Sequence, residues 1–118
     1  MKILFGVDVG GTDIKLGAFD WKSQKLLKKW NIKTNLSDDG KRIIPDVAKE
    51  IQGYLSLHGL DESDVYGIGM GIPGPVDKDG NVEVCVNLFW RNFHPAEEMK
   101  KFFPKAHLSL AFPYTSDT

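Results

Sequence analysis

The chain has 118 residues and a formal net charge of −1, with 42% hydrophobic and 26% charged residues, which suits one folded domain with a buried core. The near-zero charge excludes a strong general attraction to nucleic acid or to an anionic membrane, and the single cysteine, Cys85, excludes an internal disulfide and a cysteine-cluster metal site. No apolar run approaches the ~18 residues of a membrane helix, and the start is too short for a signal-peptide core. We therefore expect a cytoplasmic protein that contacts neither membrane nor nucleic acid.

Two alternating apolar runs, residues 3–9 and 14–18, flank the pair Gly10-Gly11. Because glycine adopts positive φ without steric cost, this pattern predicts a β-hairpin. A less regular run at residues 25–33 predicts a third strand. Three antiparallel strands of this kind form a sheet that buries one of its faces.

The same turn carries residue types that bind phosphate. Gly10 and Gly11 let a ligand approach the backbone closely, and the N–H groups of such a turn hold phosphate oxygens. Thr12 adds a hydroxyl donor and Lys15 a positive charge, while Asp8 is placed to orient a water on a Mg²⁺ ion. The ordered set predicts a phosphate site, with a plain hairpin as the alternative interpretation.

Apolar residues then recur at helical spacing up to the stop signal His58-Gly59. Pro45 would remove a hydrogen bond from a helix interior, so we expect the regular helix to begin within residues 43–45. The buried run 65–72 that follows predicts a β–α–β crossover. Three glycines in this run share one face of the strand and leave it bare, either for close helix packing or for a ligand: Gly67, Gly69 and Gly71.

A stiff bend at residues 72–75 ends that strand, and the polar segment 77–81 predicts a hairpin tip before a short strand at 82–86. Asp77 is interpreted either as a turn cap or as a functional carboxylate. Residues 88–93 are interpreted as an aromatic loop in which Phe89 and Phe93 anchor the loop against the core, with a ligand platform as the alternative.

Pro95 suits the first position of a helix, with acidic residues in the first turn and lysines in the last. A short strand follows at residues 107–110. Cys85 lies among apolar residues, so we expect a small buried side chain there rather than a nucleophile.

The pattern Asp-x-Gly-Gly-Thr-x-x-Lys at residues 8–15 resembles the first phosphate motif of the actin-like sugar kinases, and more narrowly that of the ROK family, which includes bacterial glucokinases. Residues 67–77 are similar to the Gly-x-Gly-x-Pro-Gly-x-Val-Asp segment of this family, and residues 87–90 resemble its Asn-Leu-x-Trp element. The resemblance runs from about residue 2 to residue 110. It implies the N-terminal lobe of an α/β, ribonuclease H-like (actin-like ATPase) fold, whose mixed sheet opens with a three-stranded antiparallel meander and is flanked by helices.

The resemblance also implies a function, the phosphate-binding lobe of an ATP-dependent sugar kinase of the type that converts glucose to glucose 6-phosphate. The expected cofactors are ATP and Mg, and the expected substrate is glucose or another hexose. Gly74 and Asn87 lie in segments that resemble the sugar side of the family's cleft. The residues that match the phosphate motif, and that are expected to bind the cofactor, are Asp8, Gly10, Gly11, Thr12 and Lys15.

The family places its catalytic Asn-Asp segment directly after the strand that corresponds to residues 106–110, whereas this sequence reads Ala-Phe-Pro-Tyr-Thr-Ser-Asp-Thr at 111–118. We therefore assign no catalytic residue. We assign no metal ligand either, because the single cysteine excludes a cysteine-cluster site and the three histidines lack the spacing of a local metal site. Residues 1–111 are expected to form the lobe, and residues 112–118 a divergent, flexible tail. A lobe truncated in this way is expected to be inactive alone, so whether the chain is an enzyme stays open, and its uncovered face is expected to drive homo-oligomer formation. The alternative is a non-catalytic, sugar-sensing or regulatory ROK module without a DNA-binding region.

Overall fold

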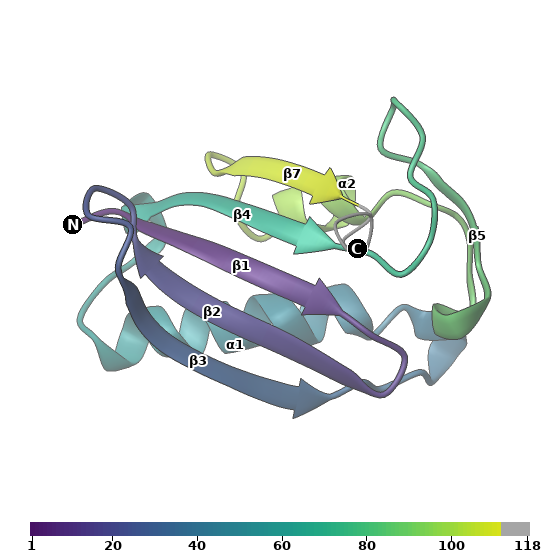
Figure 1. The fold of residues 1–118 in the computed structure, drawn as a ribbon, viewed down its shortest axis with the longest axis horizontal. Coiled ribbons are helices and arrows are strands. Elements are labelled where there is room, and N and C mark those ends of the chain that lie inside the picture. The colour runs from purple at the N-terminus through teal and green to yellow at the C-terminus, as the bar shows by residue number, and fades with distance from the viewer. Residues whose placement is uncertain (112–118) are drawn as a thin grey trace.

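Five strands form one mixed sheet in the order β3-β2-β1-β4-β7 (Figure 1). The structure is a computed structural model that describes residues 1–111. The strands of this sheet are β1 (Ile3–Val9), β2 (Asp13–Asp20), β3 (Leu26–Lys33), β4 (Val65–Gly71) and β7 (His107–Ala111).

The first three strands form the antiparallel meander that the sequence predicts. Val9 lies opposite Ile14 across the β1–β2 turn, and Leu16 lies opposite Trp30 across the β2–β3 pair. Side chains alternate between faces along a strand, so the odd-numbered residues of β1 are all buried on one side. Phe5, at the centre of β1, is fully buried and meets the ring of Tyr54 edge-on at 5.7 Å between centroids.

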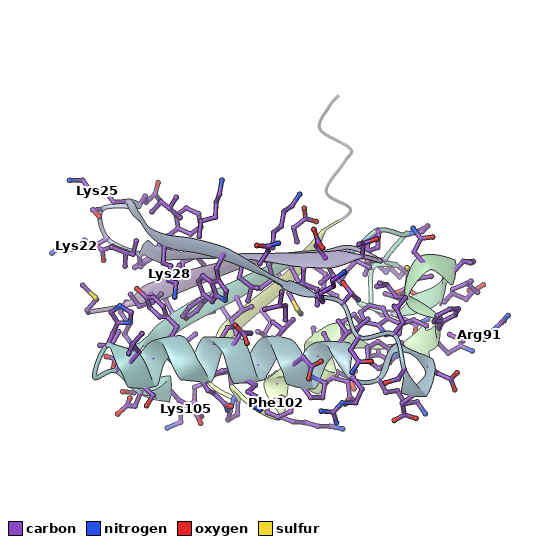
Figure 2. All side chains as sticks on the ribbon, turned by 90° about the horizontal axis from the view of Figure 1, so that it is seen from below. Lys22, Lys25, Lys28, Arg91, Phe102 and Lys105 are labelled. Carbon is purple, nitrogen blue, oxygen red and sulfur yellow. The ribbon has the colours of Figure 1, made fainter. Side chains whose placement is uncertain are left out.

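Helix α1 (Ile43–Leu57) connects β3 to β4, which pairs in parallel with β1. This arrangement confirms the predicted crossover and the predicted helix start, with Pro45 in the first turn. The helix buries a stripe that includes Ile44, Val47 and Ile51. Helix α2 (Pro95–Lys100) precedes β7 and begins with its proline, and both helices lie on the same side of the sheet (Figures 1 and 2).

The expectation of an aromatic loop at residues 88–93 is wrong. Strands β5 (Val82–Cys85) and β6 (Trp90–Phe93) pair as a separate two-stranded sheet, joined by the 3₁₀ turn η3 (Val86–Leu88). Burial in β6 does not alternate as in a regular half-buried strand, since Trp90 is buried but Arg91 and Asn92 are both exposed. Phe93 packs on Trp90 with ring centroids 4.5 Å apart, but Phe89 is 57% exposed and does not anchor this segment.

Two further 3₁₀ turns connect the elements, η1 (Asp38–Gly40) before α1 and η2 (Glu62–Asp64) before β4. Within residues 1–111, no helix has the length and apolar character needed to cross a bilayer. The tail expected at residues 112–118 lies outside the described residues.

Candidate functional site

The glycine turn, residues 10–12, joins β1 to β2 at the carboxyl end of β1. The N–H of Gly10 donates to the carbonyl of Asp13 at 2.9 Å, and the hydroxyl of Thr34 donates to the carbonyl of Gly10 at 2.7 Å. A Cβ atom on Gly10 would lie only 2.8 Å from the Asp13 carbonyl oxygen. The turn therefore needs glycine at position 10 for its own closure.

The glycine turn has two successive backbone N–H donors at Gly11 and Thr12. Within the described part of the chain, no hydrogen bond engages the N–H of Gly11 or of Thr12, although Thr12 accepts one at its carbonyl from Thr34. Successive N–H groups in a turn make a concave binding place for an anion. The local backbone is thus suited to hold a negatively charged group.

Asp8 and Lys15 flank the glycine turn on neighbouring strands. They are register partners in the β1–β2 ladder, and both side chains are exposed on the face of the sheet opposite α1. Both also line a hollow of about 540 Å³ on that face. The structure thus places a carboxylate and an ammonium on the same side of the sheet, next to the glycine turn. Thr12, which lies between these two residues in the sequence, is also exposed.

Asn87, far from the glycine turn in sequence, packs directly against it. A Cβ atom on Gly11 would lie 3.3 Å from the carbonyl oxygen and 3.5 Å from the Cβ of Asn87. The side chain of Asn87 is exposed. The η3 segment therefore brings a predicted sugar contact to the predicted phosphate turn.

Gly74 lies in the bend that follows β4 and is buried. A Cβ atom there would lie 3.4 Å from the sulfur of Cys85, whose thiol is 3.8 Å from the Pro73 carbonyl. Burial raises the pKa of the Cys85 thiol, as expected for a packed, unreactive side chain. Because β1 and β4 are parallel, with Asp8 opposite Gly71, the bend and the glycine turn leave the same edge of the sheet, where ligands bind in open α/β sheets.

A contact that sequence reasoning missed holds η3 in place. Gly40 adopts a φ of +75°, and a Cβ atom on it would overlap the carbonyl oxygen of Leu88 and lie 2.8 Å from the Trp90 ring. The indole N–H of Trp90 donates to the Gly40 carbonyl at 2.9 Å. The Asp-Gly pair at residues 39–40 signals a turn, but nothing local links it to Trp90.

Asp77 acts as a turn cap, the first of its two interpretations. Its carboxylate accepts hydrogen bonds from the N–H groups of Asn81, at 3.0 Å, and Asp79, at 2.9 Å. These backbone bonds, the one from Asn81 first, lower the pKa of the Asp77 carboxyl below its ordinary value.

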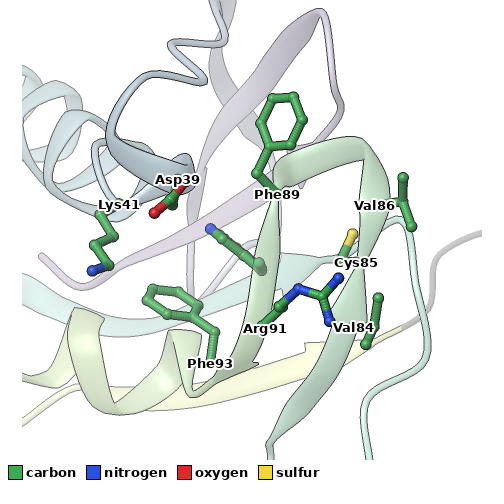
Figure 3. A pocket seen from close by; sticks show the side chains of 9 residues that line it. Asp39, Lys41, Val84, Cys85, Val86, Phe89, Arg91 and Phe93 are labelled. Carbon is green, nitrogen blue, oxygen red and sulfur yellow. The ribbon is translucent and has the colours of Figure 1, made fainter.

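A second hollow of about 480 Å³ lies between η1 and the β5–β6 hairpin, and its lining includes Asp39, Lys41 and Phe93 (Figure 3). None of the predicted cofactor or sugar residues lines it. Among residues 1–111, no group of three or more histidine, cysteine, aspartate or glutamate side chains is arranged to hold a metal ion.

Comparison with known sequences assigns this arrangement to a family. The ROK family profile matches residues 4–106. The glucokinase of Halalkalibacterium halodurans is 39% identical over 97 residues, which are 81% of this chain and 29% of that protein. The N-acetyl-D-glucosamine kinase of Vibrio cholerae is 30% identical over 84 residues, 71% of this chain and 26% of that protein. The chain thus spans less than a third of the length of either relative.

Solved structures agree with the fold. A ROK hexokinase from Thermus thermophilus superposes with a TM-score of 0.70 at 26% identity, over 92% of this chain and 35% of that one. A ROK glucokinase from Streptomyces griseus, in complex with glucose and AMPPNP, superposes with a TM-score of 0.69 at 24% identity, over 92% of this chain and 32% of that one. The actin-like architecture expected from the sequence is therefore confirmed.

Proposed function

Because the chain belongs to the ROK family, we propose that it is the N-terminal, phosphate-binding lobe of an ATP-dependent sugar kinase. The observation that carries this proposal is the glycine turn, whose two successive N–H donors bond to no residue of 1–111 and lie beside Asp8 and Lys15. Sequence similarity to the H. halodurans glucokinase supports the same assignment. The chain alone is proposed to bind nucleotide and not to turn it over.

Each residue of the proposed phosphate site has a role that follows from its chemistry. The N–H groups of Gly11 and Thr12 donate to phosphate oxygens, and the Thr12 hydroxyl adds a further donor. Lys15 supplies a positive charge to the same anion. Gly10 closes the turn that aims these donors.

Magnesium fits the donor set as an ion carried by the nucleotide. Mg²⁺ keeps several waters and is bound through one or two carboxylates together with substrate phosphates. Asp8 is an exposed carboxylate beside the turn and is suited to accept hydrogen bonds from metal-bound water. When bound, the ion neutralises charge on the phosphates.

The proposed sugar contacts, Gly74 and Asn87, lie at the edge of the sheet that also carries the glycine turn. Glucose is the first candidate substrate because the H. halodurans relative is a glucokinase, and N-acetylglucosamine is the second because the V. cholerae relative phosphorylates that sugar, as its name states. Sugar phosphorylation requires a carboxylate to accept the hydroxyl proton. We assign that role to no residue of 1–111, which is why we propose an inactive lobe.

Calorimetric titration with Mg·ATP tests the phosphate site. We expect binding by the intact chain and about tenfold weaker binding by Lys15→Gln and by Thr12→Ala, since each loses one charge-assisted contact. Lys49→Gln, which removes a lysine from the exposed side of α1, is the matched control and should bind normally. Equal affinity in all variants, or no binding at all, would contradict the proposal.

A coupled assay for ADP formation with glucose or N-acetylglucosamine tests the proposed inactivity. We expect no turnover above that of a mock purification. Turnover that survives removal of contaminating kinases would show that a catalytic carboxylate is present, and the proposal of an inactive lobe would be wrong.

A further inference from the structure

Thr34, the residue directly after β3, holds the glycine turn from one side. Its hydroxyl donates to the carbonyl of Gly10 at 2.7 Å, and its N–H donates to the carbonyl of Thr12 at 2.9 Å. Figure 1 shows that β3 ends beside the turn that joins β1 to β2. A single residue from outside the turn thus bonds to the backbone on either side of Gly11.

The hydroxyl bond of Thr34 is an addition to the regular strand pairing. The pair formed by Asp13 and Lys33 is the last of the β2–β3 ladder at this end, and the N–H of Thr34 continues the ladder by one bond. A ladder supplies backbone bonds only, so the bond from the hydroxyl to Gly10 is a separate contact. Among residues 1–111, no other side chain hydrogen-bonds to the backbone of the glycine turn.

Closure of the turn does not depend on the Thr34 hydroxyl. The N–H of Gly10 donates to the carbonyl of Asp13 at 2.9 Å, and this bond turns the chain from β1 into β2. Val9 and Ile14 then begin the β1–β2 ladder. The hydroxyl bond therefore has another consequence, which is to fix the orientation of the peptide group between Gly10 and Gly11.

The planarity of the peptide group links this bond to a donor of the proposed phosphate site. In a planar, trans peptide group the carbonyl and the N–H point in opposite directions. The carbonyl of Gly10 and the N–H of Gly11 belong to the same peptide group, and the described residues contain no cis peptide bond. Because the Thr34 hydroxyl holds the carbonyl of Gly10, the N–H of Gly11 is directed away from Thr34.

The second bond of Thr34 restricts the other donor of the turn. The carbonyl of Thr12 is held by the N–H of Thr34, so the peptide group after Thr12 is fixed as well. The peptide group that carries the N–H of Thr12 lies between these two fixed groups. Glycine has more backbone freedom than any other residue, so a turn with Gly10 and Gly11 needs such anchors to hold its donors in one direction.

We propose that Thr34 is a positioning residue for phosphate binding, whose hydroxyl aims the N–H of Gly11, and with it the N–H of Thr12, at the bound anion. This inference rests on the proposed function of the glycine turn. Thr34 does not contact the anion, since its hydroxyl proton is used on the carbonyl of Gly10, on the opposite side of the peptide group. Donors that are already aimed need no reorganisation when the anion binds, and this raises the affinity.

Nuclear magnetic resonance relaxation of the ligand-free chain tests the aiming of the donors directly. Thr34→Val keeps the β-branched shape and removes the hydroxyl, whereas Thr34→Ser keeps the hydroxyl. We expect the order parameter of the Gly11 N–H to fall from near 0.85, typical of rigid backbone, to below about 0.6 in Thr34→Val. In Thr34→Ser it should stay in the rigid range, and the dispersed amide spectrum verifies that each variant is folded.

Calorimetric titration of the same variants measures the consequence for binding. The two probes are Mg·ATP and inorganic tripolyphosphate with magnesium, which presents the phosphates without a nucleoside. We expect Thr34→Val to bind both probes about tenfold more weakly than the unaltered chain, because the two N–H donors are no longer held in place. Thr34→Ser should bind both probes within about twofold of the unaltered chain, since its hydroxyl restores the bond to Gly10.

Asp61→Ala is the control for a general loss of stability. The carboxylate of Asp61 accepts a hydrogen bond from the N–H of Ser63 at 2.9 Å and caps η2, which precedes β4. The glycine turn follows β1, and β4 runs parallel to β1, so this cap lies at the opposite end of the sheet. Loss of the cap lowers the stability of the chain. It should leave the Gly11 order parameter and the affinity for both probes unchanged.

The positioning role of Thr34 is overturned by an unchanged Gly11 order parameter in Thr34→Val, or by a lowered order parameter with unchanged affinity. A serine variant that behaves like the valine variant, or an equal loss of affinity in Asp61→Ala, would also overturn it. If the unaltered chain binds neither Mg·ATP nor tripolyphosphate, the proposed function fails. The order parameters then still decide whether the Thr34 hydroxyl directs the N–H of Gly11, so the two failures are distinguishable.

Discussion

The contact between Gly40 and Trp90 gives the sharpest prediction for the fold. We expect Gly40→Ala to destabilise the chain far more than an alanine usually does at a glycine with positive φ. The reason is that position 40 combines a φ of +75° with a Cβ position that overlaps the Leu88 carbonyl oxygen and crowds the Trp90 ring.

The expected magnitude has three contributions. Holding alanine in the left-handed region costs roughly 1–2 kcal/mol. Displacing the Trp90 indole breaks its hydrogen bond to the Gly40 carbonyl, which contributes about 1 kcal/mol. The added methyl group also crowds the side chain of Trp90, which is only 2% exposed, and this overpacking costs about a further 1–3 kcal/mol. We therefore expect a loss of roughly 3–6 kcal/mol in the free energy of unfolding, close to the whole stability of a small domain.

Urea unfolding followed by tryptophan fluorescence measures this loss, with two glycine controls from the same chain. Gly59 has a φ of +68°, but a Cβ atom there would meet nothing within 4 Å, so Gly59→Ala should show the backbone cost of roughly 1–2 kcal/mol alone. Gly53 lies in α1 without a close neighbour, so Gly53→Ala should stabilise the chain by about 0.5–1 kcal/mol. The reasoning is refuted if Gly40→Ala is no more destabilising than Gly59→Ala.

Three further predictions concern single side chains. Trp90→Phe removes the indole N–H and leaves the Gly40 carbonyl without its hydrogen-bond donor. Urea unfolding should therefore show a loss of about 1–3 kcal/mol in the free energy of unfolding, and an unchanged midpoint would contradict this. The lowered pKa of Asp77 means that its contribution to stability is present above the ordinary aspartate pKa of about 3.9 and is lost as the pH falls through the folded value. Asp77→Ala should therefore lose less stability than the unaltered chain between about pH 5 and pH 3 in paired unfolding curves, and equal losses would argue against the cap. Cys85 is 2% exposed with a raised thiol pKa, so a thiol reagent should label it far more slowly in the folded chain than in urea, and equal labelling rates would contradict its burial.

Most of the main sheet follows from patterns that are local in sequence. The alternation on either side of Gly10-Gly11 predicts β1 and β2, and the helical spacing after residue 43 predicts α1 with the correct start despite Pro45. The β–α–β crossover into β4 follows from the intervening helix, because parallel strands need a long connection, whereas the choice of β1 as the partner of β4 comes from the tertiary structure. Each of these patterns can be recognised within a short window of sequence, a few turns of helix or a few residues of strand.

The segment 82–93 shows where this kind of reasoning fails. Two strands of four residues each, joined by a short 3₁₀ turn, give too little alternation to distinguish a hairpin from a loop. The turn also holds Phe89 at a φ of +62°, a conformation that a bulky residue rarely adopts and that no turn rule predicts for phenylalanine. Tertiary packing of Trp90 and Cys85 decides the pairing instead.

The sequence by itself determined the family, the meander and the candidate phosphate residues, because Asp8 to Lys15 form one contiguous motif whose geometry a single turn dictates. Only the tertiary structure decided that Asn87 packs against Gly11, that Trp90 bonds to Gly40, and that Gly17, Gly6 and Gly69 from three separate strands lie in one row across the sheet. The physical reason is the range of the interactions: a turn is specified by its own dihedral angles, whereas a contact between distant segments depends on how the whole sheet and its helices pack.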